Sequence, residues 1–135
     1  MDIVSACLVG CQCRYDGGTQ PREDLIKLYQ AGKLIPVCPE QLGGLPTPRD
    51  PAEQIGNKLI TNQGADVTAE YAKGAQEALR LTQEVKAKKA YLKSRSPMCG
   101  KDTIYDGTFS GTLTKGNGVF TQQLLKHNIE VVSID

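Results

Sequence analysis

Short apolar segments alternate with helix-like segments along this chain, and this alternation restricts the fold more than any other feature. The apolar segments, which are expected to form strands, are Ile3–Leu8, Leu34–Cys38, Ala90–Leu92 and Ile129–Ile134. The helix-like segments are a stretch that begins near Pro21 and ends at Gly32, then Val67–Lys88 and Asn117–His127. Strands that alternate with helices form mostly parallel sheets with right-handed crossovers. The sequence therefore predicts an α/β fold, a three-layer Rossmann-like sandwich with a mostly parallel sheet, in which residues 1–135 form a single domain.

Prolines and glycines refine this outline. Pro36 lacks an N–H donor, which predicts that the second strand lies near a sheet edge or is irregular. Residues 39–57 are rich in proline and glycine, which predicts a long loop without helix or strand, and such loops usually carry function. Residues 58–61 are expected to form a small extra strand, and residues 100–118 a loop or hairpin. Gly74 is expected to let the long helix pack closely against the sheet.

Charge and hydropathy exclude several classes of function. The 16 basic and 15 acidic residues give a net charge of +1, which offers no basis for nucleic-acid binding. No segment approaches the roughly 18 apolar residues of a membrane span, and the N-terminus lacks the basic and apolar regions of a signal peptide. We therefore expect a cytoplasmic protein with no nucleic-acid or membrane partner, while the oligomeric state stays open. In that reducing compartment, five cysteines favour metal or catalytic roles over disulfides.

Three of the cysteines come at or after the ends of predicted strands. Cys7 lies at the end of the first strand, Cys38 ends the second, and Cys99 follows the third. Since parallel sheets bind ligands at the carboxyl ends of their strands, these thiols are expected to hold one metal centre with an open position. Thiolates suit Zn²⁺ or an iron–sulfur cluster, but the spacing matches no paired zinc knuckle. Buried cysteines that pack as small apolar side chains are an alternative of equal weight.

Polar side chains flank these thiols. Glu40 follows Cys38 by two residues, where burial or nearby thiolates would raise its pKa and let it exchange protons with a substrate. A solvated loop carboxylate is an equally good interpretation of Glu40. Ser96 can donate a hydrogen bond, relay a proton or act as a nucleophile, and Arg95 can offset the charge of thiolates or of a cluster.

Two Tyr-Asp-Gly segments, at 15–17 and 105–107, are typical of loops that approach a ligand closely. Asp16 and Asp106, together with Ser5 and Arg95, are therefore candidates for a substrate pocket. Two tight turns without a ligand explain the same pattern as well. No phosphate-binding or dinucleotide motif occurs, so a nucleotide cofactor is unsupported.

Taken together, these segments resemble the bacterial domain-of-unknown-function 523 (DUF523) family, and the resemblance runs nearly end to end. It rests on Val4-Ser5-Ala6-Cys7-Leu8, Arg14-Tyr15-Asp16-Gly17-Gly18, Val37-Cys38-Pro39-Glu40, Leu42-Gly43-Gly44-Leu45-Pro46-Thr47-Pro48-Arg49, Gly64-Ala65-Asp66-Val67-Thr68, Lys93-Ser94-Arg95-Ser96-Pro97-Met98-Cys99-Gly100 and Tyr105-Asp106-Gly107-Thr108-Phe109-Ser110-Gly111.

Members of that family include iron–sulfur thiouracil desulfidases. The resemblance therefore implies a [4Fe-4S] cluster held by Cys7, Cys38 and Cys99, whose fourth iron binds the sulfur of a thiolated pyrimidine or related thiocarbonyl substrate. It also implies that Glu40 and Ser96 are catalytic. Water would replace sulfur without redox change, which gives uracil and sulfide. Two alternatives stay open: a metal- or cluster-binding module that handles sulfur without catalysis of its own, and a zinc-binding protein. Cys11 and Cys13 receive no role.

Overall fold

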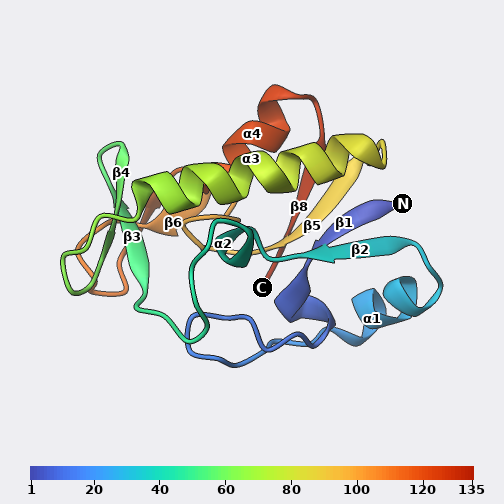
Figure 1. Cartoon of the computed structure of the whole chain (residues 1–135), viewed down its shortest axis with the longest axis horizontal. Helices are drawn as coiled ribbons and strands as arrows, with labels where there is room; N and C mark the ends of the chain where they lie inside the picture. The colour runs from blue at the N-terminus through green and yellow to red at the C-terminus, as the bar shows by residue number, and fades with distance from the viewer.

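A four-stranded parallel sheet forms the centre of the computed structural model, which describes residues 1–135 (Figure 1). Its strands, in spatial order, are β2 (Leu34–Val37), β1 (Asp2–Ser5), β5 (Lys89–Lys93) and β8 (Glu130–Ile134). Every neighbouring pair is parallel. The predicted α/β fold with a mostly parallel sheet is therefore confirmed, and Pro36 lies in the edge strand β2, as its missing donor requires.

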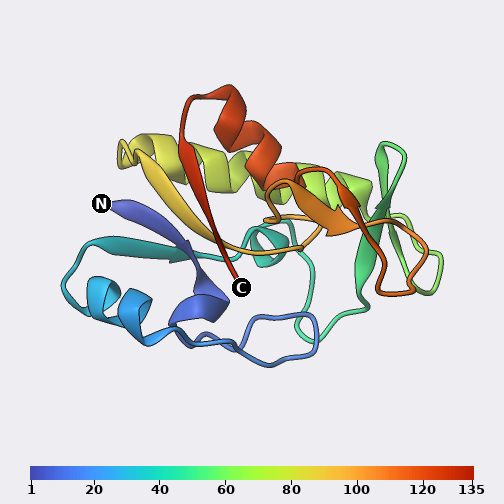
Figure 2. The same ribbon diagram turned by 180° about the vertical axis from the view of Figure 1, so that it is seen from behind.

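Helices cover both faces of the sheet and make it the middle of three layers (Figures 1 and 2). Helix α1 (Glu23–Gln30) lies on one side, and α3 (Thr68–Glu84) with α4 (Val119–Lys126) lies on the other. Successive strand residues point to opposite faces. Accordingly, Val4 packs in the smaller core between the sheet and α1, while Ile3 packs in the larger core between the sheet and α3 and α4. None of the helices combines the length and the apolar character that crossing a bilayer requires.

Two antiparallel hairpins and two short helical turns complete the fold. The hairpins are β3 (Ala52–Ile55) with β4 (Lys58–Thr61), and β6 (Thr103–Tyr105) with β7 (Leu113–Lys115). The turns are η1 (Ala6–Val9), a 3₁₀-helix, and α2 (Pro39–Leu42). The small strand predicted at residues 58–61 and the hairpin predicted within 100–118 are both confirmed. Figure 1 shows the hairpins beyond the carboxyl ends of β1 and β5.

The prediction of an unstructured loop at residues 39–57 was wrong, because this segment contains α2 and β3. Pro39 begins α2 at a position where a missing N–H costs no hydrogen bond. Strand β3 exists through its pairing with β4, a contact that local sequence does not reveal. The first strand was also predicted too long. It ends at Ser5, and η1 follows, so Cys7 lies on a 3₁₀ turn.

Gly74 packs against α2 rather than against the sheet, which corrects the expectation from sequence. A Cβ atom on Gly74 would overlap the carbonyl group of Pro39, and one on Gly43 would overlap that of Glu70. The backbones of α2 and α3 are therefore in direct contact, as only glycine at both positions allows. This contact fixes the short helix that carries Glu40.

We expect Gly74→Ala to lower the free energy of unfolding by about 1–3 kcal/mol, the usual cost of overpacking a tight contact. The added methyl group must push α2 away from α3, because its nearest neighbours are backbone atoms. Urea unfolding of the variant and of Lys73→Ala measures the difference, since Lys73 is exposed on the same helix. Equal stabilities of Gly74→Ala and the wild type would contradict the contact.

Candidate active site

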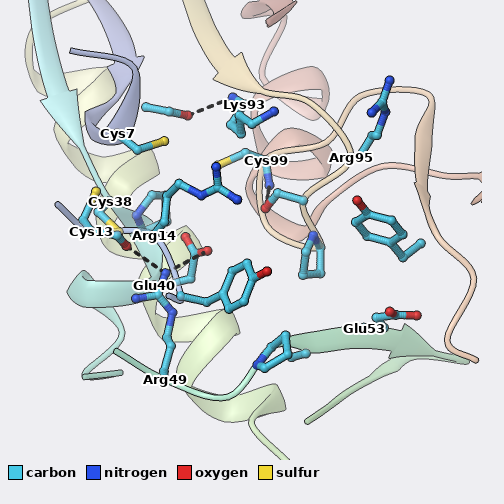
Figure 3. A pocket seen from close by; sticks show the side chains of 18 of the residues that line it. Cys7, Cys13, Arg14, Cys38, Glu40, Arg49, Glu53, Lys93, Arg95 and Cys99 are labelled. Carbon is cyan, nitrogen blue, oxygen red and sulfur yellow. Dashed lines mark hydrogen bonds and ion pairs between the residues drawn. The ribbon is translucent and has the colours of Figure 1, made fainter. Parts of the chain in front are cut away.

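A cavity of about 530 Å³ opens beyond the carboxyl ends of β2, β1 and β5. Its walls include all three cysteines that the sequence singled out, although they come from distant parts of the chain (Figure 3). Four of the other candidate residues also line it, namely Ser5, Glu40, Arg95 and Ser96. The structure therefore brings together seven of the nine residues that sequence reasoning proposed.

The three thiols converge because their strands are neighbours in the sheet. Cys7 lies on η1 directly after β1, and Cys38 directly follows β2. Cys99 follows β5 by six residues, and a turn at Arg95, whose φ is 66°, redirects this segment. Hydrogen bonds to their backbone carbonyl groups hold two of these cysteines in position. The carbonyl oxygen of Cys7 accepts from Gln20 N at 3.0 Å, and that of Cys99 accepts from Thr121 Oγ1 at 2.8 Å.

Cys13 places a fourth thiol in the same wall. It is 5% exposed, whereas Cys11, two residues away, is exposed. The Cys13 thiol is in contact with those of Cys38 and Cys7, and the Cys38 thiol also lies 3.8 Å from the Cys13 carbonyl oxygen. Contact with Cys38 lowers the pKa of Cys13, but contact with Cys7 and burial raise it, and the balance raises the pKa to about 12.

The surroundings of two of the implied cluster ligands favour the protonated thiol over the thiolate. Contact with Cys13 and then burial raise the pKa of Cys38. Burial and then the charge of Glu40 raise the pKa of Cys99. Metal groups bind thiolates, so a metal group that binds here must displace these protons.

Positive side chains surround the thiols. Arg14, Lys93 and Arg95 all line the cavity (Figure 3). Burial and then the charge of Arg14 lower the pKa of Lys93, which shows that cations are crowded here. The nearest carboxylate contacts of Arg14 and Arg95 are both 3.9 Å long and involve exposed aspartates. A cation-rich cavity with several thiols fits an anionic thiolate-bound cluster.

No three His, Cys, Asp or Glu side chains surround a point where a single metal ion would sit. A cubane cluster spreads its thiolate ligands over separate iron atoms, so its donors need not meet at one point. Thiolate donors that come from separate strand ends are compatible with an iron–sulfur cluster.

Glu40 points into the cavity from α2 and pairs with Arg49 (Figure 3). Arg49 Nη2 lies 3.4 Å from Glu40 Oε2 and donates to the carbonyl oxygen of Cys13 at 3.0 Å. The other terminal nitrogen, Nη1, contacts Thr47 Oγ1 at 3.1 Å. Burial raises the pKa of Glu40, and the positive charge of Arg49 opposes that rise. The two effects give a carboxyl group that can both hold and release a proton.

Ser96 and Ser5 are held in place by backbone donors. Ser96 Oγ accepts from the N–H groups of Met98 and Cys99 at 3.0 and 3.1 Å. Its hydroxyl proton is therefore free to be donated into the cavity. Ser5 Oγ accepts from Lys93 N at 3.0 Å, which joins the ends of β1 and β5. The Ser5 hydroxyl is also in contact with the Cys99 thiol.

Asp16 and Asp106 lie outside the cavity, unlike the other candidates. Asp16 Oδ1 accepts from Gly18 N at 2.9 Å, and Asp106 Oδ1 accepts from Thr108 N at 3.0 Å. Each carboxylate is turned toward its own loop backbone, as the turn interpretation of the Tyr-Asp-Gly segments predicted. Their neighbours Tyr15 and Tyr105 line the cavity instead.

Sequence reasoning missed several residues of this site. Arg49 lies in one of the family motifs but received no role, although a cation that ends a proline-rich loop was a usable signal. Tyr71 lies within the predicted helix-like segment Val67–Lys88 and received no role, yet it borders the cavity near Glu40, where burial and then the charge of Glu40 raise its pKa. Glu53 and Phe109 also line the cavity; no local pattern marked Glu53, and Phe109 lies in a family motif but received no role.

Several known proteins resemble this chain in sequence or in structure. The sequence profile of the family described as 2-thiouracil desulfurase matches residues 3–135. A protein of Bacillus subtilis (strain 168), described as uncharacterized protein YbbK, is 41% identical over 143 residues, which cover 98% of this chain and 95% of the relative. A solved structure described as the [4Fe-4S]-dependent thiouracil desulfidase TudS (DUF523Vcz) aligns with a TM-score of 0.93 and 45% identity. The alignment covers 98% of this chain and 89% of that chain.

Proposed function

The chain belongs to the 2-thiouracil desulfurase family, and on this premise we propose that it removes sulfur hydrolytically from a small thiolated pyrimidine such as 2-thiouracil. The proposed cofactor is a [4Fe-4S] cluster bound by Cys7, Cys38 and Cys99. The reaction consumes one water and yields uracil and hydrogen sulfide, so no electron donor or acceptor is needed. The similarity to a solved [4Fe-4S]-dependent thiouracil desulfidase supports both the activity and the cluster.

One observation carries the assignment of residues. Cysteines from three strand ends, a carboxylate and a hydroxyl group line a single cavity, although they lie as far apart in the sequence as residues 7 and 99. When bound, a cluster with three cysteine ligands supplies a Lewis acid at its remaining iron for the substrate sulfur. Arg14, Lys93 and Arg95 offset its negative charge.

Glu40 and Ser96 then have separate tasks in this proposal. Glu40 takes a proton from the attacking water in this proposal, because burial raises the pKa of its carboxyl group while the charge of Arg49 opposes that rise. Ser96 donates a hydrogen bond to the group that gains charge during attack, since its oxygen is already fixed by two N–H donors. Tyr71 and the η1 turn line the same cavity.

Sulfide release from 2-thiouracil by protein that is purified and reconstituted without oxygen tests the function. We expect about four irons and four acid-labile sulfides per chain, together with sulfide and uracil in equal amounts. Cluster-loaded protein that releases no sulfide would favour the sulfur-handling module without catalysis. Stoichiometric zinc in place of iron in protein isolated without oxygen would favour the zinc alternative.

A further inference from the structure

The loop between β6 and β7 forms a wall of the cavity that the assigned residues do not explain. Tyr105, Phe109 and Gly111 of this hairpin all line the cavity. Phe109 is 37% exposed, although it is large and apolar. Its φ of 55° lies in the left-handed region, where a bulky side chain is strained. Strain of this kind persists only where the surrounding structure enforces it, and it gathers at ligand sites.

Glu53 on β3 enforces this conformation. Its Oε1 atom accepts from Gly107 N at 2.9 Å and from Phe109 N at 3.2 Å. Glu53 is only 8% exposed, and these two N–H groups are the hydrogen-bond partners of its carboxylate. Gly107 lets the loop approach closely, because a Cβ there would lie 2.7 Å from the carbonyl oxygen of Gln54. The carboxylate thus clamps the loop on both sides of Thr108.

Glu53 and the loop that it holds lie across the cavity from the thiols. Figure 3 shows Glu53 on the side opposite Cys7, Cys13 and Cys38. Gln54, the next residue, donates to the carbonyl oxygens of Pro97 and Asn117 at 3.2 and 3.0 Å. Strand β3 therefore ties the aromatic wall to the segment that carries Ser96 and Cys99.

We propose that Phe109 determines substrate binding by packing its ring against the flat pyrimidine, and that Glu53 is the positioning residue that holds Phe109 there. This inference rests on the proposed function, because a planar substrate between the thiol wall and the hairpin is its premise. A planar ring suits such a contact, since aromatic faces attract one another beyond simple burial.

The test compares Phe109→Ala, Phe109→Tyr and Leu113→Ala in cluster-loaded protein. Phe109→Ala should raise KM for 2-thiouracil about tenfold with nearly unchanged kcat, as loss of uniform binding does. Phe109→Tyr keeps the ring and should stay near the wild-type KM. Leu113→Ala is the matched control, because Leu113 is 41% exposed on the same hairpin but does not line the cavity. An unchanged KM in Phe109→Ala overturns the role of Phe109.

Glu53→Ala and Glu53→Gln test the positioning role. Glu53→Ala should raise KM as much as Phe109→Ala, and the double variant should raise it no further. Glu53→Gln retains an acceptor at Oε1 and should keep most of the affinity. Additive effects of the two alanine substitutions, or a lower thermal midpoint with wild-type KM, overturn positioning by Glu53.

Equilibrium dialysis of 2-thiouracil separates this inference from the proposed function. If loaded wild-type protein binds 2-thiouracil but releases no sulfide, the function fails, while the Kd values of the same variants still decide the role of Phe109. If it releases sulfide and Phe109→Ala changes neither KM nor Kd, only the inference fails. Loaded wild-type protein that does not bind 2-thiouracil overturns both.

Discussion

Cys38→Ser protein that is purified and reconstituted without oxygen is expected to hold at least about tenfold less iron than the wild type. Even substitutions beside a metal ligand cost about 10- to 100-fold in metal affinity, so loss of a ligand costs at least as much. Serine nearly preserves the size of cysteine, but its hydroxyl group does not supply the thiolate that an iron–sulfur cluster requires. Sulfide release from 2-thiouracil should fall below detection with the iron.

Iron and acid-labile sulfide per chain are the primary measurements, because they do not depend on turnover. Cys11→Ser is the matched control, since Cys11 is exposed and lies in the loop next to the buried Cys13. It should load like the wild type. Full iron content in Cys38→Ser would remove Cys38 from the proposed ligand set.

The same experiment with Cys13→Ser decides between two sets of thiols. Family resemblance selects Cys7, Cys38 and Cys99, but the structure places the Cys13 thiol in contact with two of them. We expect Cys13→Ser to retain its iron, because three ligands suffice for the proposed cluster. If Cys13→Ser loses its iron and Cys7→Ser retains it, Cys13 replaces Cys7 in the proposed ligand set.

Cys13 illustrates where reasoning from sequence stops. Cys11 and Cys13 are equivalent in a Cys-x-Cys pattern, and local sequence does not say which one turns inward. Tertiary contacts decide it: Arg49, 36 positions later, donates to the Cys13 carbonyl oxygen. Burial of Cys13 thus depends on how the loop after η1 meets the segment after α2.

The main outline was predictable because it depends on local patterns and on one geometric rule. Apolar runs between helical stripes gave the order of the strands along the chain, and neighbouring parallel strands bring Cys7 and Cys38 to one edge of the sheet. Strand β3 escaped prediction because its pairing with β4 is what makes it a strand. Glu53 was missed with it, although that residue anchors the aromatic wall.

Glu40→Gln is expected to lower kcat for 2-thiouracil by about 10²- to 10⁴-fold, the usual contribution of a positioned general acid or base. Glutamine matches the carboxylate in size and still offers an oxygen to Arg49, but it does not take a proton from water. The cluster should load fully, because Glu40 supplies no ligand in the proposed set. Iron content and initial rates of sulfide release, measured on the same samples, separate loss of turnover from loss of cofactor.

The substitution also affects stability through Arg49, whose side chain is 7% exposed and lies beside a Glu40 side chain that is 15% exposed. In Glu40→Gln the buried guanidinium keeps a neutral acceptor but loses its carboxylate partner, which costs about 1–3 kcal/mol of stability. Gln41→Ala controls for changes in α2, since Gln41 is exposed on that helix. A kcat within threefold of the wild type would assign the proton transfer to another group. Ser96, the other catalytic residue of the proposed mechanism, would then be the first candidate. Ser96→Ala would then show the larger loss, and the buried pair of Glu40 and Arg49 would serve to hold α2 against the loop that carries Cys13.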